Sequence, residues 1–230
     1  MGASSSRPLS RPLSAAALDA ASVALFAASA ALLLARLDHA PPLAWWPLLA
    51  ASAWAGVCAA DLATGATHWL FDSFFDEATP WVGAGFVRPF REHHRDPSAI
   101  VRHGFLEVSG NNALALAPAL WLCAPAARDF GVELASSAWL SFALAGLAAA
   151  FVTNQLHRWA HAERPPRAVR WLQRRRWILS PDEHARHHTG AHDCAYCVTT
   201  GWLNAPLDRL GVFRGLEAAL RARAPKRAGP

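Results

Sequence analysis

The sequence predicts an all-α integral membrane protein, a four-helix bundle with a cytosolic cap rich in histidine. Charged residues make up only 17% of the chain, below the roughly 25% of ordinary globular proteins, and they are nearly absent from several long apolar runs. Basic residues crowd toward the C-terminus, and the net charge is +5. Six of the 11 histidines fall between Asn154 and His192. These observations indicate a membrane protein with a basic cytosolic side that carries a metal site.

We expect a basic N-terminal tail at residues 1–14, one membrane domain at 15–220 and a basic C-terminal tail at 221–230. A membrane span needs about 20 apolar residues. Four stretches meet or approach this length, at about 15–35, 43–60, 110–127 and 135–157. The first is longer than the roughly 7–15-residue core of a signal peptide, so we interpret it as a span. The third contains Pro118 and Pro125 and is the shortest apolar run.

The distribution of basic residues supports four spans with both termini in the cytosol. Of the 22 lysines and arginines, only Arg36 and Arg128 then fall outside, as the positive-inside rule requires. The same topology places every histidine except His39 on the cytosolic side. It also explains the basic surface without nucleic acid, so a nucleic-acid partner is not expected. The membrane would be the inner membrane of a bacterium or the endoplasmic reticulum of a eukaryote.

Several shorter elements are expected on the cytosolic side. Asp96-Pro97 is typical of a helix start, and the helix of the fourth span can continue to Glu163 before Pro165-Pro166 stops it. Ser180-Pro-Asp-Glu183 is a capping box that predicts a short helix ended by Gly190. A final amphipathic helix is expected at 207–220.

Two further stretches between these elements have a plain and a sharper interpretation. The arginine-rich segment from Arg164 to Arg176, with Trp171 and Trp177, is expected to face lipid headgroups, and contact with a substrate phosphate is the alternative. Cys194-Ala-Tyr-Cys197 is interpreted as two thiols in a turn rather than a zinc or redox motif, because no second cysteine pair completes a site.

The histidines are spaced as metal ligands are on helices. Side chains three or four residues apart share one helix face, as in His157-Arg-Trp-Ala-His161 and His184-Ala-Arg-His187-His188. His93 and His94 are neighbours that a helix cannot aim at one point, and His94 is slightly favoured. His103 and His192 are balanced between ligand and supporting roles. The candidate metal ligands are His68, His93, His94, His103, His157, His161, His184, His187, His188 and His192.

So many imidazoles exceed one zinc site, which uses four ligands, or three and a water. No H-E-x-x-H motif of a zinc protease is present. Two iron ions fit better, because oxygen chemistry requires a redox metal. Nearby carboxylates can accept the second ring N–H of a histidine ligand, although a salt bridge or helix cap is the commoner role. Asn154 is a polar helix contact or a weak ligand. The candidates for residues that hydrogen-bond to the metal ligands are Asp61, Asp72, Glu107 and Asn154.

Several motifs occur together in a fixed order. They are Asp61-Leu-Ala-Thr-Gly-Ala-Thr-His68, Arg88-Pro-Phe-Arg-Glu-His93-His94, Arg102-His103, Asn154-Gln-Leu-His157-Arg-Trp-Ala-His161, His184-x-x-His187-His188-x-x-x-His192 and Thr199-Thr-Gly-Trp-Leu-Asn204. In these motifs the chain resembles the plasmanylethanolamine desaturase family, the Kua/CarF group of membrane lipid desaturases, over roughly Ala60 to Glu217.

The resemblance implies an O2-dependent, iron-requiring desaturase that converts the 1-O-alkyl chain of an ethanolamine ether phospholipid into the vinyl ether of a plasmalogen. Electrons would come from a separate cytochrome b5-like or ferredoxin-like carrier. More distant relatives desaturate an acyl chain of phosphatidylglycerol, so an acyl-lipid desaturase or a hydroxylase is an alternative. A non-catalytic membrane protein that binds metal for signalling is the alternative from another class.

Overall fold

A computed structural model describes residues 13–35, 41–83, 87–129 and 133–223 of the chain. Within these ranges all regular secondary structure is helical, as the sequence predicts. His39, Arg36 and most of both predicted tails lie outside the described residues.

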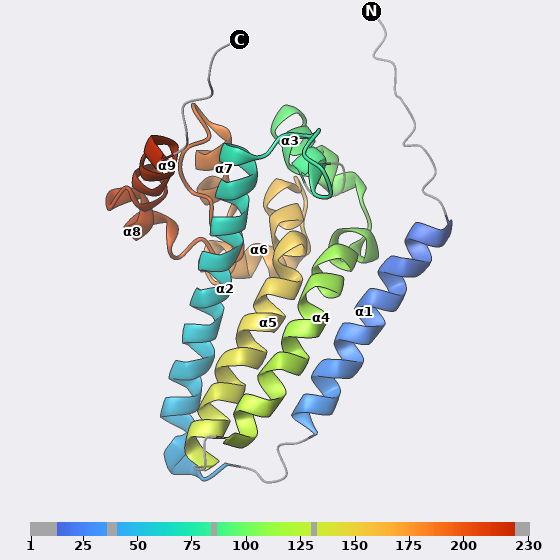
Figure 1. The fold of residues 1–230 in the computed structure, drawn as a ribbon, viewed down its shortest axis with the longest axis vertical. Coiled ribbons are helices and arrows are strands. Elements are labelled where there is room, and N and C mark those ends of the chain that lie inside the picture. The colour runs from blue at the N-terminus through green and yellow to red at the C-terminus, as the bar shows by residue number, and fades with distance from the viewer. Residues whose placement is uncertain (1–12, 36–40, 84–86, 130–132, 224–230) are drawn as a thin grey trace, which may run out of the picture.

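Four long helices lie side by side in the order α2, α5, α4, α1 (Figure 1). Their bounds are α1 Leu13–Leu34, α2 Trp46–Phe74, α4 Phe105–Asp129 and α5 Glu133–His161. The second expected span, at 43–60, is therefore only the first half of a helix that runs on to Phe74. α5 ends at His161, two residues before the predicted Glu163.

Among the described residues, three helical segments are long and apolar enough to cross a membrane: Leu13–Leu34, Leu43–Phe74 and Glu133–His161. They correspond to the first, second and fourth predicted spans and indicate a membrane protein. α4 is not among the three, although it packs between α1 and α5 (Figure 1). The crossing expected at 110–127 and the orientation of the termini stay predictions.

The two helices that carry most of the predicted site contact each other closely. A Cβ on Gly56 of α2 would collide with the backbone carbonyl of Phe142 on α5. A Cβ on Gly146 would lie 2.9 Å from the carbonyl oxygen of Gly56. Glycine at both positions therefore lets the two backbones touch. This contact fixes α2 and α5 against each other, so their ends emerge together at one end of the bundle.

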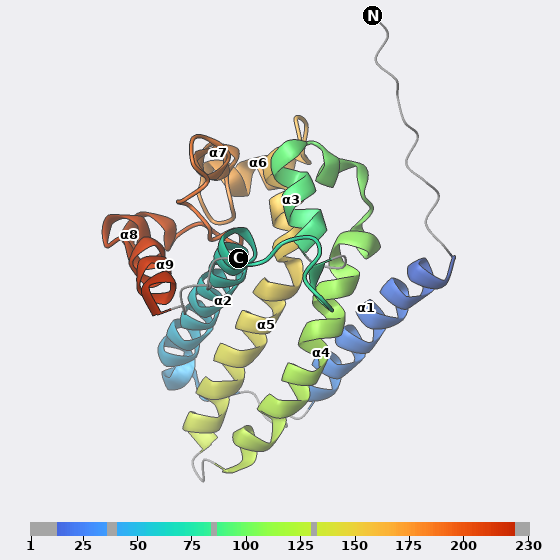
Figure 2. The same ribbon diagram turned by 45° about the horizontal axis from the view of Figure 1, so that its top comes forward.

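The shorter helices form a cap at that end of the bundle (Figures 1 and 2). They are α3 Arg88–Arg95, α6 Arg167–Arg174, α7 Pro181–His188, α8 Asn204–Arg209 and α9 Val212–Arg223. The capping box is confirmed, because the Ser180 hydroxyl accepts a hydrogen bond from the Glu183 N–H at 3.4 Å.

Two predictions for the cap are wrong. Asp96 does not begin an α-helix; it ends α3, and only a short 3-10 turn, Ala99–Arg102, follows. The single helix expected at 207–220 is two helices, α8 and α9, separated at Gly211 with φ of 61°. Glycine adopts this left-handed conformation readily, which explains the break.

Candidate metal centre

Five imidazoles from three helices converge inside the cap. Their ligand nitrogens all lie within 4.8 Å of one another. The Nε2 atom of His157 is 2.9 Å from that of His93 and 2.8 Å from that of His184. Nε2 atoms of further pairs are separated by 3.0–3.1 Å. We call this set the five-histidine group: His93 of α3, His157 and His161 of α5, and His184 and His188 of α7.

A second set of side chains lies beside the first and includes a carboxylate. Oδ2 of Asp72 is 3.4 Å from Nε2 of both His68 and His187, and 3.7 Å from Nε2 of His94. The Nε2 atoms of His94 and His187 are 3.0 Å apart. We call this set the aspartate group: His68 and Asp72 of α2, His94 of α3 and His187 of α7.

Helical spacing explains how four elements supply both sets. Each of the pairs His68–Asp72, His157–His161 and His184–His188 is four residues apart, so its members share one face. The neighbours His93 and His94 diverge, as expected, but each joins a different group. The slight preference for His94 over His93 is therefore not supported by their positions.

Burial lowers the pKa of four imidazoles of the cap and so keeps them neutral. It lowers the pKa of His93 to about 2, of His188 to about 3 and of His94 to about 4, with neighbouring histidines adding to the shift in each case. The pKa of His184 is also lowered well below its usual value by burial. A neutral imidazole has a lone pair on one nitrogen, so these rings can accept a cation without losing a proton first.

Backbone carbonyls orient two rings of the aspartate group. Nδ1–H of His187 donates to the carbonyl oxygen of Cys194 at 2.8 Å, and Nδ1–H of His68 donates to that of Tyr196 at 3.2 Å. Because a carbonyl oxygen can only accept a hydrogen bond, the proton of each ring is on Nδ1. The lone pair of Nε2 is then directed at the other members of the aspartate group. Both acceptors belong to the segment after α7. Sequence reasoning missed them, because backbone acceptors carry no residue signature.

The geometry fits bound metal ions. Nε2 of His68 and both carboxylate oxygens of Asp72 are buried without a hydrogen-bond partner among the described residues, although buried polar atoms are normally satisfied. Two nitrogens bound at right angles to one ion, each about 2.1 Å from it, lie about 3.0 Å apart, whereas tetrahedral ligands would lie about 3.4 Å apart. In the five-histidine group the observed separations of 2.8–3.1 Å match the first arrangement. In the aspartate group the two nitrogens of His94 and His187 are 3.0 Å apart, but Oδ2 of Asp72 lies 3.4 Å from the nitrogens of His68 and His187, which is the tetrahedral spacing. Both groups are therefore compatible with iron.

Two candidate ligands lie outside both groups. His192 stacks on His94, with ring centroids 4.7 Å apart, and its Nδ1–H donates to the carbonyl of His187 at 2.9 Å. It supports the aspartate group from one side. His103 is exposed and pairs with Glu107 at 2.9 Å. Neither His103 nor Glu107 belongs to the five-histidine group or the aspartate group.

Two other polar candidates, Asp72 and Asn154, have different surroundings. Asp72 lies among the histidines rather than behind one of them. Asn154 donates to the carbonyl of Val108 at 2.8 Å and to Oδ1 of Asn112 at 3.2 Å, so it joins α5 to α4 and does not orient an imidazole. This contact is the polar helix contact that the sequence left open.

Asp61 anchors the C-terminal part of the cap to α2. Its fully buried Oδ1 accepts hydrogen bonds from the N–H groups of Thr199, Thr200 and Gly201 at 2.8–3.1 Å. It contacts this loop, and no hydrogen bond to an imidazole is seen for it within the described residues. The nearby Cys194 and Cys197 are free thiols whose pKa is raised by burial, and they lie in an irregular segment rather than in the predicted turn.

The chain is similar to known proteins over most of its length. The lipid desaturase domain family matches residues 57–228, which contain every member of both groups. A plasmanylethanolamine desaturase of Myxococcus xanthus is 38% identical over 203 residues, which are 87% of this chain and 70% of the relative. Plasmanylethanolamine desaturase 1 of Mus musculus is 39% identical over 189 residues, 81% of this chain and 68% of the relative.

A chloroplastic fatty acid desaturase 4 of Arabidopsis thaliana is 34% identical over 172 residues, which cover 73% of this chain and 50% of the relative. No solved structure matches the chain.

Proposed function

Since the chain belongs to the lipid desaturase family and is a desaturase, we propose that its substrate is 1-O-alkyl-2-acyl-glycerophosphoethanolamine. It would introduce the 1′–2′ double bond of the alkyl ether chain and so form the vinyl ether of a plasmalogen. The convergence of two ligand groups beside the bundle supports this chemistry. The identities of 38% and 39% to two plasmanylethanolamine desaturases support this substrate over the acyl substrate of the fatty acid desaturase.

The five-histidine group and the aspartate group would each hold one iron ion. Bound there, iron would supply the redox chemistry that uses O2 to remove hydrogen from an unactivated carbon chain. Imidazole nitrogens suit iron, and in the five-histidine group the right-angle spacing of the Nε2 atoms favours it over tetrahedral zinc. His103, Glu107, Asp61 and Asn154 have no part in this proposal as ligands or as partners of ligands, whereas His192 would hold the ring of His94.

The reaction also needs a source of electrons. Removing two hydrogens from the chain and reducing O2 to two waters consumes two further electrons and two protons. We propose that an external carrier of the cytochrome b5 or ferredoxin type supplies them. The residues of the cap hold the ligands and exclude water, and Phe90 lies 5.2 Å from the ring of His68 on the aspartate side. No side chain of the cap is needed as a general base.

We further propose that the cap lies on the cytosolic side with both termini, at the bacterial inner membrane or the endoplasmic reticulum. α1 begins and α9 ends near the cap (Figure 1). An even number of crossings, with α4 as one of them, would produce this arrangement. The distribution of basic residues along the sequence favours the same orientation.

Lipid analysis of a host that is supplied with alkyl ether lipid and expresses this chain tests the proposal. The wild type should yield aldehydes after mild acid, which cleaves vinyl ethers. His161→Ala and His187→Ala, one from each group, should abolish them at equal protein abundance, and the exposed His103→Ala should not. A new acyl double bond or a hydroxylated lipid would replace the proposal with the acyl-lipid desaturase or hydroxylase. Unchanged lipids would favour a non-catalytic metal-binding protein.

A further inference from the structure

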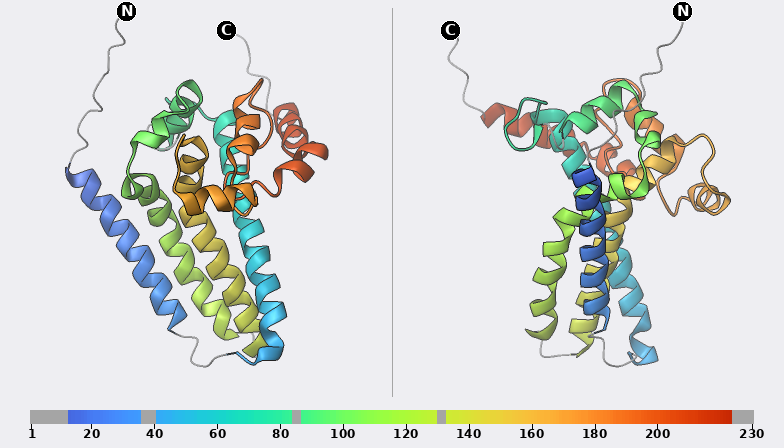
Figure 3. Two further views of the ribbon diagram at one scale, coloured as in Figure 1. Left: turned by 180° about the vertical axis from the view of Figure 1, so that it is seen from behind. Right: turned by 90° about the vertical axis from the view of Figure 1, so that its right-hand side faces the viewer.

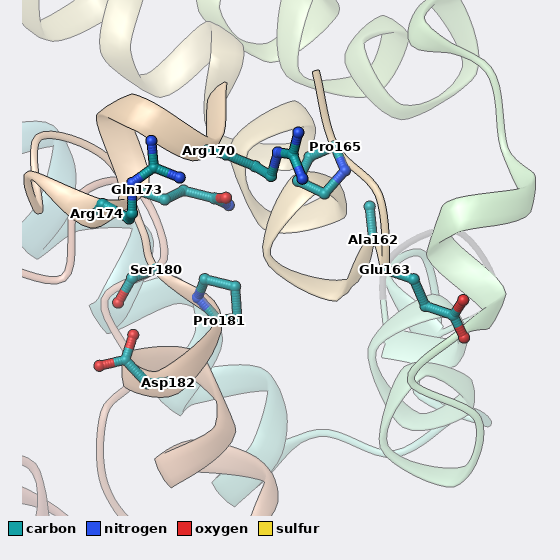
Figure 4. Close-up of a pocket in the computed structure, with 9 residues that line it drawn as sticks. All are labelled: Ala162, Glu163, Pro165, Arg170, Gln173, Arg174, Ser180, Pro181 and Asp182. Carbon is teal, nitrogen blue, oxygen red and sulfur yellow. The ribbon is translucent and has the colours of Figure 1, made fainter. Parts of the chain in front are cut away.

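A pocket of about 250 Å³ lies between α6, the start of α7 and the connection that leaves α5 (Figure 4). It is smaller than the roughly 300–1,000 Å³ of pockets for drug-sized ligands. Arg170 and Arg174 extend over it from α6, Ser180 and Asp182 lie opposite, and Glu163 forms its rim with the carboxylate turned outward. The pocket therefore has two arginines on one wall, a carboxylate paired with Arg176 on the opposite wall and a second carboxylate at its edge.

We infer that this pocket binds the zwitterionic phosphoethanolamine headgroup of a phospholipid, with the phosphate on Arg170 and Arg174 and the ammonium at Glu163. The identification of that lipid as the substrate rests on the proposed function. The binding of the headgroup does not.

The two arginines are available for a phosphate. They are four residues apart on α6 and so share one face. No ion pair engages either of them within the described residues, whereas Arg176 pairs with Asp182 at 3.1 Å and Arg175 lies 5.6 Å from the ring centre of Trp171. The planar guanidinium donates two parallel hydrogen bonds to a phosphate. Arg170 and Arg174 are thus the phosphate ligands of this pocket.

The carboxylates of the pocket have different roles. Asp182 is occupied by Arg176. Glu163 has no ion-pair partner among the residues that the structure describes. A primary ammonium can donate hydrogen bonds to Glu163, but the trimethylammonium of choline cannot. The rim therefore favours an ethanolamine headgroup over a choline headgroup.

Two observations on α6 favour a position of the pocket at the depth of lipid headgroups. α6 projects from the base of the cap, beside the ends of the long helices (Figure 3). Trp171 and Trp177 of this segment are 42% and 57% exposed, and their ring centroids are 5.3 Å apart. Exposed tryptophan beside arginine is typical of the interface between membrane and water. The buried Gln173 donates to the carbonyl of Trp159 at 3.2 Å and fixes α6 to α5.

The pocket is also adjacent to the five-histidine group. Its wall includes Ala162, which follows His161, and Asp182, which precedes His184 by two residues. In an ether phospholipid only the glycerol backbone separates the phosphate from the ether chain. A headgroup held here would place the first carbons of that chain near the metal ligands, and such positioning favours reaction at one bond.

The double variant Arg170→Ala/Arg174→Ala tests the site, and Arg164→Ala/Arg167→Ala is the matched control, because it removes two charges from the same segment outside the pocket. For the loaded enzyme with ethanolamine ether lipid in mixed micelles, we expect the first pair to raise KM at least about tenfold, or about 1.4 kcal/mol, with kcat within about twofold. The control should leave both constants unchanged. An unchanged KM, or an equal rise in the control, would overturn the site.

Binding is measured separately from turnover. The purified protein is incubated with vesicles that contain ethanolamine phospholipid, and the bound lipid is then measured by native mass spectrometry. We expect the wild type and Arg164→Ala/Arg167→Ala to retain the ethanolamine phospholipid and Arg170→Ala/Arg174→Ala to lose it. Glu163→Gln should reduce the preference for ethanolamine over choline phospholipid at least about threefold; an unaltered preference contradicts the role of Glu163. If the wild type retains the lipid but forms no vinyl ether, the proposed function fails and the headgroup site stands.

Discussion

The two ligand groups differ in charge and in how their rings are held. The five-histidine group consists of imidazoles from α3, α5 and α7, packed against one another. The aspartate group adds the carboxylate of Asp72 and takes its orientation from the carbonyls of Cys194 and Tyr196. A carboxylate lowers the net charge of a bound ion and favours its oxidised state, while neutral donors favour the reduced state. Ions bound in the two groups would therefore differ in their electronic properties.

Loss of a central nitrogen from the five-histidine group should have the largest effect. His157→Ala removes the Nε2 atom that lies within 2.9 Å of both His93 and His184. We expect activity to fall more than about 100-fold, beyond the loss typical of outer-sphere changes, and iron to fall from two ions to one per chain. Vinyl ether formation and iron content measure this, with His103→Ala as control. Two retained ions would refute the assignment.

Removal of the carboxylate of Asp72 tests whether the two groups hold separate ions. Asp72→Asn keeps the volume but removes the charge, so we expect a loss of about 10–100-fold in activity and selective loss of the iron of the aspartate group. Iron content and Mössbauer spectra distinguish one remaining nitrogen-bound ion from two. Asp193→Asn, which changes an exposed carboxylate 3.7 Å from Arg214, is the matched control. An unchanged spectrum in the Asp72 variant would contradict the proposal that Asp72 binds one of the two ions.

Acid should destabilise the metal-free protein through both groups. The pKa of His94 is lowered to about 4 and that of His93 to about 2 by burial, against about 6.5 when unfolded. Below pH 6.5 the unfolded chain binds protons that these folded rings do not, so stability falls as pH decreases. The loss of stability that is due to His94 is complete by about pH 4, whereas the loss that is due to His93 continues toward pH 2.

Thermal denaturation in detergent at pH 7 and pH 5, with the metal removed by a chelator, checks this pH dependence. We expect Tm to be lower at pH 5 by on the order of 5 °C. His94→Gln should reduce the dependence, because glutamine does not titrate. A Tm that rises on acidification would show that the rings are not held neutral.

The smallest effect is expected at the edge of the aspartate group. His192→Ala removes a ring stacked on His94 and a hydrogen bond to the carbonyl of His187, but no member of either group. Activity should fall less than about threefold, with two irons retained. Iron content decides between the roles of support and ligand: loss of one ion would make His192 a ligand.

Much of the centre follows from helical spacing. The intervals His157–His161 and His184–His188 predict pairs on one face, and the structure brings both pairs together. His68 and Asp72 have the same interval, yet a single carboxylate near a histidine is too common in sequences to identify as a ligand. The split of His93 and His94 between groups depends on the position of α3, which no local pattern gives.

The fold was predictable to a similar degree. Long apolar runs predict the helices, and Gly211 could have signalled the break between α8 and α9. The hydrogen bond that the N–H of Thr199 donates to Asp61 joins residues 138 positions apart, and contact at that separation leaves no periodic signal.

Both groups depend on the last histidine-bearing helix to emerge during synthesis. When α5 has left the ribosome, His93, His157 and His161 are present for one site, and His68, Asp72 and His94 for the other. Three protein ligands and a water are the set that catalytic zinc accepts. Docking of α7 adds His184 and His188 to the first site and His187 to the second. Until α7 folds onto the bundle, each of the two proposed iron sites would therefore be open to a metal other than iron.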